Sequence, residues 1–121
     1  MDSVTRDRLL RLVGLGVRSR GAVVGVEQVR SAAFSGKLAY AVVATDASRH
    51  SLNKVKPLLD ARRIRYVEGP SAAELGAAVG REFTAAVGIT DRQLARGIRA
   101  LVESGQRPDR GAPSGPERRM D

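Results

Sequence analysis

The chain of 121 residues contains no cysteine and no tryptophan, and only two phenylalanines, two tyrosines and one histidine. Without cysteine there is no disulfide framework, no thiol nucleophile and no thiolate metal site. The one histidine, His50, stands in a polar segment with no second histidine to complete a metal set, so we expect an ordinary surface residue. The inventory therefore predicts no catalytic site, no metal and no cofactor.

Long hydrophobic runs are also missing. The apolar stretch 38–45 is far shorter than the roughly 20 residues that span a bilayer, and the segment 9–17 is interrupted by Arg11 and does not resemble a signal peptide. Hydrophobic residues make up 42% of the chain, which is ordinary for a soluble domain. We therefore expect a cytoplasmic protein without a membrane partner, monomeric when free.

Positive charge is in excess and is unevenly distributed along the chain. The formal net charge is +8. Residues 1–66 carry 13 Lys and Arg against five Asp and Glu, whereas residues 67–103 carry four against five. A one-sided basic field favours a polyanion partner, most simply nucleic acid. From charge alone, an arginine-rich composition that only aids solubility is equally compatible.

Apolar periodicity predicts a regular alternation of helices and strands. Helices are expected from a cap at Ser3 to near Gly16 and over 25–35, 48–62, 71–79 and 91–103, with strands at 22–24, 38–44, 64–68 and 85–90. The almost continuously apolar run 38–44 suits a central strand covered on both faces. The chain therefore predicts the α/β class, a three-layer α/β/α sandwich with a mixed sheet of about four strands.

Three local signals refine this prediction. Pro57 predicts a kink or a break near Lys56, because proline removes a helical hydrogen bond. The spacing of Ser71 and Glu74 predicts a capping box at the start of a helix. Residues 104–121, rich in proline and glycine, predict a disordered tail after a folded domain of residues 1–103.

The start of the second predicted helix is the strongest candidate for a binding site. Gly25 opens the helix, so its first amide groups and the positive end of its dipole are available to an anion. Gln28 can donate to and accept from a base edge, whereas Glu27 can only accept. Phosphate contacts are expected from Arg18, Arg20, Arg30 and Lys37. The alternative is a solvated helix face.

Four segments together resemble a known family. They are Gly-Val-Glu-Gln at 25–28, Gly-Lys-Leu-Ala at 36–39 with a strand ending in Ala-Thr-Asp at 44–46, Ile-Arg-Tyr-Val at 64–67, and Pro-Ser-Ala-Ala-Glu-Leu-Gly at 70–76. In this order and spacing, the chain from about residue 9 to 101 resembles the kink-turn RNA-binding ribosomal-protein superfamily of L7Ae and L30e type, most closely its small stand-alone bacterial members. The resemblance implies a three-layer sandwich with a mixed four-stranded sheet.

The resemblance also implies two RNA-binding surfaces. In the family, a Gly-x-Asn-Glu-x-x-Lys pattern at the second helix reads the sheared G·A pairs of a kinked loop. Gly25 matches the glycine, whereas Glu27, Gln28 and Ser31 stand where Asn, Glu and Lys are usual. The second surface, the loop that packs against a flipped-out nucleotide, corresponds here to Gly69, Pro70 and Ser71.

The resulting hypothesis is a non-enzymatic protein that recognises kinked, structured RNA. Ribosomal RNA is the expected partner, with ribosomal proteins as further candidates. Two alternatives stay open. One is a protein-interaction module of the same fold without its RNA site, and the other is a stand-alone relative of the substrate-recognition domain of an RNA-modifying enzyme.

Overall fold

The computed structural model describes residues 1–106, in which five helices alternate with four strands. The elements are α1 (Ser3–Arg18), β1 (Ala22–Val24), α2 (Val26–Phe34), β2 (Tyr40–Val43), α3 (Arg49–Ala61), β3 (Tyr66–Glu68), α4 (Ala72–Ala78), β4 (Ala86–Ile89) and α5 (Arg92–Gln106). Every predicted element is present; β1 has the predicted bounds, and the other three strands are shorter than predicted. No helix within this part of the chain is long and apolar enough to cross a membrane.

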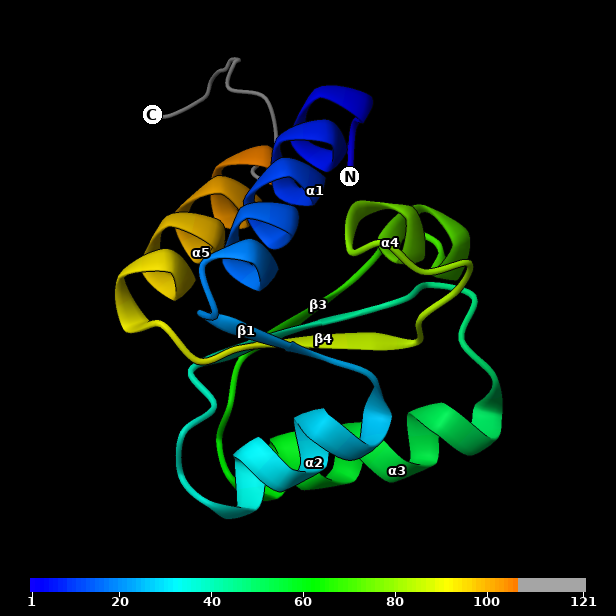
Figure 1. Cartoon of the computed structure of the whole chain (residues 1–121), viewed down its shortest axis with the longest axis vertical. Coiled ribbons are helices and arrows are strands. Elements are labelled where there is room, and N and C mark those ends of the chain that lie inside the picture. The colour runs from blue at the N-terminus through cyan, green and yellow to red at the C-terminus, as the bar shows by residue number, and fades with distance from the viewer. Residues whose placement is uncertain (107–121) are drawn as a thin grey trace, which may run out of the picture.

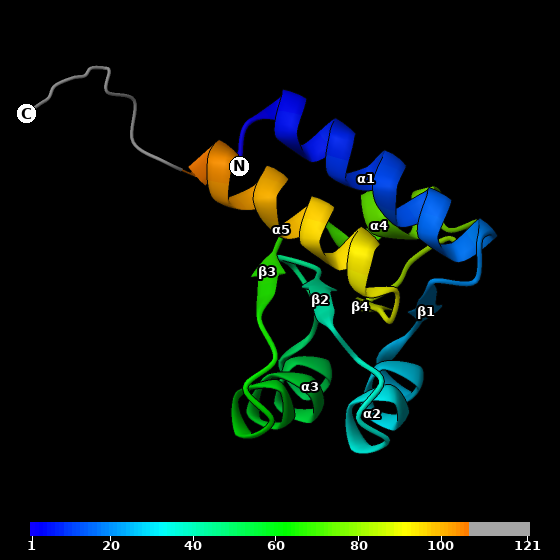
Figure 2. The same cartoon turned by 90° about the vertical axis from the view of Figure 1, so that its left-hand side faces the viewer.

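The strands form one mixed sheet in the order β1-β4-β2-β3. Strand β4 runs antiparallel to both of its neighbours, and β2 runs parallel to β3. Helices α1, α4 and α5 cover one face of the sheet, and α2 and α3 lie side by side on the other (Figures 1 and 2). The predicted three-layer α/β/α sandwich is confirmed.

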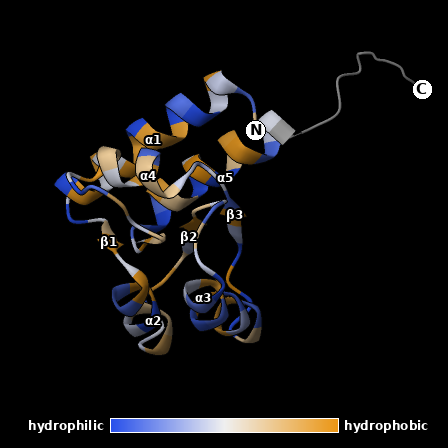
Figure 3. Ribbon diagram, turned by 90° about the vertical axis from the view of Figure 1, so that its right-hand side faces the viewer, coloured by the Kyte–Doolittle hydropathy of each residue, from blue (hydrophilic) through white to orange (hydrophobic). Residues whose placement is uncertain are grey.

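Strand β2 is the centre of the core, because all four of its residues are buried. Tyr40 and Val42 pack into the cluster under α1, α4 and α5, whereas Ala41 and Val43 pack into the cluster with α2 and α3. This alternation follows from the two-residue period of a strand. Blue and orange residues alternate along α1 in Figure 3, as expected for a helix with only one face on the core.

The caps of α1 and α3 partly follow the prediction. Asp2, rather than Ser3, caps α1, because its carboxylate accepts a hydrogen bond from the Thr5 amide at 2.7 Å. The same bond, followed by charge attraction, lowers the pKa of Asp2. Helix α1 continues past the predicted end at Gly16 to Arg18. Ser48 caps α3 by accepting from the Ser51 amide.

Of the kink or break predicted near Lys56, the break is wrong, because α3 continues through Pro57 from Arg49 to Ala61. Proline leaves the carbonyl of Asn53 without its helical donor. Asn53 and Pro57 are exposed, so water can supply the missing donor, while Val55 and Leu59 on the opposite face are buried. Core packing therefore keeps the helix in one piece.

Helix α5 extends beyond the predicted domain end at residue 103. Residues 104–106 were expected in the disordered tail but are helical. Gly105 lies so close to α1 that a Cβ there would come within 2.5 Å of the Thr5 hydroxyl oxygen. Packing against α1 thus extends the helix by almost a turn. The remainder of the predicted tail, residues 107–121, lies outside the described residues.

Two helices are followed by arginine where glycine is usual. Arg20 after α1 has φ = 65°, and Arg63 after α3 has φ = 57°. The chain reverses at these positions through hydrogen bonds from Gly21 to Gly16 and from Ile64 to Leu59. A side chain in this left-handed region costs roughly 1–2 kcal/mol relative to glycine. The fold therefore loses stability by having arginine at both positions.

The substitution Arg63→Gly is expected to raise the free energy of unfolding by about 1 kcal/mol, because it relieves the left-handed strain. Urea denaturation at pH 7 measures this change. The matched control is Arg62→Gly, since Arg62 has φ = −93° and its guanidinium lies over the Phe34 ring. Arg62→Gly should destabilise the fold. If both variants shift stability in the same direction, the strain argument is refuted.

Candidate nucleic-acid interface

The sheet topology gathers the loops of the molecule at two opposite ends. Strands β1, β2 and β3 run in one direction and β4 runs in the other. We call the segments 25–28, 44–48, 69–72 and 81–85 the Gly25 end, because β1, β2 and β3 finish there and β4 begins there. The segments 18–21, 36–39, 62–65 and 90–92 form the Tyr40 end. The two ends lie on the right and left of Figure 1.

Helix α2 begins at the Gly25 end without a side-chain cap. Gly25 has φ = 100° and ψ = 156°, a conformation that side chains rarely adopt. Its amide donates to the Ala86 carbonyl at 2.9 Å, and its carbonyl accepts from the Val29 amide at 3.0 Å. The amides of residues 26–28 come before the first helical hydrogen bond. The backbone therefore presents donors at the positive end of the helix dipole.

The side chains of the first two turns of α2 differ in what they can reach. Gln28 and Ser31 are exposed and have no partner among the described residues. Glu27 is exposed but pairs with Lys54 Nζ at 3.2 Å, which links α2 to α3. Arg30 is half-buried and donates to the Lys54 carbonyl at 2.7 Å. Gln28 is thus the free polar side chain nearest the open amides, whereas Arg30 helps to hold α2 against α3.

The predicted second surface, the loop from Gly69 to Ser71, lies at the same end but is mostly covered. Gly69 donates to the Val43 carbonyl at 2.8 Å, and the Pro70 carbonyl accepts from Thr45 at 2.9 Å; the Gly69–Pro70 peptide bond is cis. Both residues are buried, and Ser71 is half-exposed. Burial gives Gly69 and Pro70 a supporting role, which corrects the prediction that all three residues face the partner.

Helix α4 begins beside this loop with its first amides already occupied. Ser71 Oγ accepts from the Glu74 amide at 3.1 Å, and Glu74 Oε1 accepts from the Ser71 amide at 3.0 Å. The predicted capping box is therefore confirmed. The Ala72 amide donates to Asp46 at 2.7 Å. Three helices therefore start at the Gly25 end: α2 has no side-chain cap, whereas Ser48 caps α3 and Ser71 caps α4.

The structure adds a segment that the sequence reasoning missed. Residues 81–83 precede β4, and the Phe83 side chain is 65% exposed. A Cβ at Gly76 would come within 2.8 Å of the Phe83 backbone, and the Thr84 amide donates to the Ala72 carbonyl. These contacts hold the backbone of Phe83 against α4 and leave its side chain exposed. Only the antiparallel direction of β4 places Phe83 at the Gly25 end, which local sequence patterns do not reveal.

Three of the residues predicted to contact phosphate lie away from the Gly25 end. Arg18 and Arg20 precede β1, and Lys37 follows α2, so all three belong to the Tyr40 end or border it. Helix α2 has nine residues and spans about 14 Å, which separates Lys37 from Gly25. The prediction that these residues flank the start of α2 is therefore wrong, because the strand and the helix each cross the molecule.

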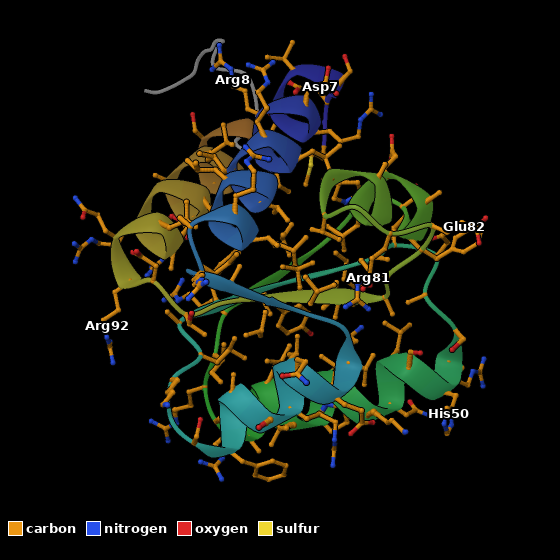
Figure 4. The ribbon with its side chains drawn as sticks, viewed as in Figure 1. Asp7, Arg8, His50, Arg81, Glu82 and Arg92 are labelled. Atoms are coloured by element: carbon orange, nitrogen blue, oxygen red, sulfur yellow. The ribbon has the colours of Figure 1, made fainter. Side chains whose placement is uncertain are left out.

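Charges at the Gly25 end are mixed. Lys54 pairs with Glu27, and Lys56 pairs with Glu68 at 2.7 Å, a hydrogen bond that raises the pKa of Lys56. Arg81 is followed by Glu82, and Figure 4 shows Glu82 and His50 on the side of the molecule opposite Arg92. Within residues 1–106 no group of three or more acidic or histidine side chains could hold a metal. The four segments of this end carry Glu27, Asp46 and Glu82 against Arg81, so they offer hydrogen-bond donors and one aromatic ring but no net positive charge.

These features define a three-layer α/β/α protein with an open helix start between two loops. A family model matches residues 7–98, and the chain belongs to the ribosomal protein L7Ae/L30e/S12e/Gadd45 family. No curated protein matches the chain.

Two solved structures illustrate the likeness. A protein of unknown function from Bacillus halodurans has 27% identity and a TM-score of 0.73, with 78% of this chain and 96% of that chain covered. The Giardia lamblia 15.5kD RNA binding protein has 20% identity and a TM-score of 0.73, with 86% and 89% covered. The likeness to the Giardia lamblia protein shows a shared fold and no more.

The capping box makes a pH-dependent contribution to stability. The hydrogen bond from the Ser71 amide, then the Ser71 side chain and the charge of Arg6, lower the pKa of Glu74 below its ordinary value of 4.5. Ionised Glu74 therefore stabilises the fold above that value, and the contribution is lost as the pH falls through the lower folded-state pKa.

The variant Glu74→Gln should therefore lose this dependence. Glutamine keeps an acceptor for the Ser71 amide but no charge. Wild type should be the more stable protein at pH 7, and the difference should shrink towards pH 3, as measured by urea denaturation at several pH values. Glu82→Gln removes the same charge from an exposed residue of the next loop and serves as the control. A difference that is constant across pH for Glu74→Gln contradicts the mechanism.

Proposed function

We propose that the protein is a non-enzymatic RNA-binding protein that recognises kinked RNA at the Gly25 end. The observation that carries the proposal is the uncapped start of α2, where Gly25 leaves backbone donors open beside the free Gln28 side chain. Family membership and the RNA-binding protein of similar fold support RNA as the partner. Ribosomal RNA in the cytoplasm is the proposed natural target, in keeping with the ribosomal members of the family.

The recognition mechanism follows from what the site presents. The open amides of α2 can donate to phosphate or base oxygens, and Gln28 can pair with a base edge through one donor and one acceptor. Phe83 offers a ring on which an unstacked base can stack. Such groups read bases that a kink has exposed, whereas a regular RNA duplex keeps its base edges in a deep, narrow major groove. The site is therefore suited to irregular RNA.

Lys54 supports this mechanism by restraining Glu27. A free carboxylate beside phosphates would repel RNA, but the ion pair with Lys54 Nζ at 3.2 Å partly neutralises it. Glu27 then remains available to accept from a guanine edge or a cytosine amine. The pair is exposed, so salt weakens it, and we assign it no large stabilising effect.

A direct test compares a kink-turn RNA with a straight duplex of equal length in a binding titration at fixed salt. The protein should bind the kinked RNA more tightly, and Gln28→Ala should lose about 1–3 kcal/mol of that preference. Ser31→Ala, one turn further along the exposed face of α2, should leave it nearly unchanged. Equal affinity of the wild-type protein for both RNAs would refute kink recognition.

Phe83→Ala provides an independent test of the stacking role. Loss of one base–aromatic stack should weaken binding of the kinked RNA by about 1–3 kcal/mol while affecting the straight duplex little. Phe34→Ala is the matched control, since Phe34 is also exposed, at 55%, but lies at the far end of α2. The ratio of the two affinities is the measured quantity. A similar ratio for both variants would exclude a specific role for Phe83.

A further inference from the structure

The Tyr40 end contains a small hollow with an unusual lining. Its volume is about 190 Å³, and no carboxylate lines it. The lining residues are Ala39, Tyr40, Arg65, Arg92, Ala95, Arg96 and Arg99. Three of the arginines come from one face of α5, and Arg65 comes from the segment that enters β3. The hollow is therefore lined by four arginines from parts of the chain far apart in sequence.

This arrangement is electrostatically unfavourable for the isolated protein. Arg92 and Arg96 are four residues apart on α5, and Arg99 follows three residues later, so like charges are neighbours on the helix. Arg92 also occupies the first residue of α5, where the positive end of the helix dipole disfavours a cation. Contacts within the described part of the chain give no reason to place Arg92 and Arg96 along this stripe.

The protein itself compensates only part of this charge. Glu103 accepts from Arg99 Nε at 2.8 Å and lies 3.8 Å from Arg65. Arg92 and Arg96 are exposed, and neither has an ion pair or hydrogen bond within the described part of the chain. The carboxylate of Asp91 accepts from the amides of residues 93 and 94 and caps α5. At least two guanidinium groups are thus available to an external anion.

We infer that this hollow and its four arginines form a second RNA-binding surface, which takes the backbone phosphates of an RNA segment other than the one at the Gly25 end. Guanidinium groups match phosphate oxygens through paired N–H donors. The surface has no exposed aromatic ring in its lining and no open helix start, so we assign it to phosphate contacts and not to base stacking. It adds affinity independent of sequence.

The separation of the two ends explains why a second segment is required. Tyr40 pairs with Ile89 and Val43 pairs with Ala86, so the central strands run from one end to the other. Figure 4 shows Arg92 on the opposite side of the molecule from Glu82 and His50. The groups that read bases and the groups that attract phosphate therefore lie at opposite ends of the protein. One RNA contacts both only if it folds around the protein or offers two helices. The inference goes beyond the proposed function, because it does not depend on kink recognition and applies to any RNA whose second segment can bring its backbone phosphates to the Tyr40 end.

The test removes two charges from this surface and two from another. Arg92→Gln with Arg96→Gln alters the hollow, and Arg8→Gln with Arg11→Gln removes the same charge from exposed positions of α1. Each protein is titrated with the kink-turn RNA and the straight duplex over a series of salt concentrations. The first pair should weaken both RNAs by a similar factor and reduce the slope of log affinity against log salt by about 2. The second pair should leave the slope nearly unchanged.

The outcomes separate this inference from the proposed function. If the first pair lowers the slope while the kinked and straight RNAs bind equally, the second surface stands and kink recognition falls. If both pairs lower the slope equally, only a diffuse field acts and the inference is overturned. The inference is also overturned if neither pair of substitutions changes RNA binding. If in that case the first pair abolishes binding of an acidic protein, the surface binds protein and not RNA.

A second measurement uses the absence of cysteine from the chain. A single cysteine introduced as Arg96→Cys or as Gln28→Cys can carry an iron chelate that cleaves nearby RNA. On a kink-turn RNA with extended stems, the two positions should give separate cleavage zones, at a stem for residue 96 and at the kink for residue 28. Cleavage of the same nucleotides from both positions, or none from residue 96, overturns the inference.

Discussion

The burial of β2 on both faces is the constraint on which the rest of the structure depends. Its four residues alternate between two hydrophobic clusters, so one short strand holds both helical layers in place. Pairing with β4 on one side and β3 on the other fixes where the neighbouring strands end. Because β2 and β3 are parallel and β4 is antiparallel, four loops meet at each end of the sheet. The directions of the strands therefore decide which loops form the candidate nucleic-acid interface.

The starts of α2 and α4 at the Gly25 end show how similar backbone geometry can serve different purposes. At α4, Ser71, Glu74 and Asp46 occupy the first amides, and the helix start is therefore a structural anchor for the loop 69–71. At α2, Gly25 supplies no side-chain acceptor. Glycine is required there by φ, but it also leaves the donors open. A serine or aspartate cap would close the site that the proposal needs.

Much of the fold was predictable because its determinants are local. The apolar run at 38–44, the capping box at residues 71 and 74, and the periodicity of the helices each act within a few residues. The errors have non-local causes. Helix α3 passes Pro57 because the packing of Val55 and Leu59 outweighs one lost hydrogen bond, and α5 continues to Gln106 because Gly105 fits against Thr5. Neither contact is visible in a window of sequence.

The candidate site follows the same division. Gly25 and Gln28 lie where the pattern put them, since one helix start defines both. Phe83 and the burial of Gly69 and Pro70 depend on which strands are neighbours, which periodicity does not specify. The arginines were misplaced for a related reason. Residues close in sequence to Gly25 were expected to be close in space, but a strand or a helix carries Arg20 and Lys37 to the far end.

Charge along the chain and charge in space therefore lead to different conclusions. Along the sequence, the positive excess lies in the first half, on both sides of the start of α2. In the structure, Lys54 and Lys56 of α3 pair with Glu27 and Glu68. The stripe on α5 belongs to a nearly neutral stretch of sequence, yet it leaves the side chains of Arg92 and Arg96 unpaired among the described residues. Two like charges near the positive end of a helix dipole oppose folding by a small amount. An anion bound between them is attracted both by the arginines and by the helix dipole and so offsets both effects. For this reason we infer the site of phosphate binding from the uncompensated arginines and not from the total charge.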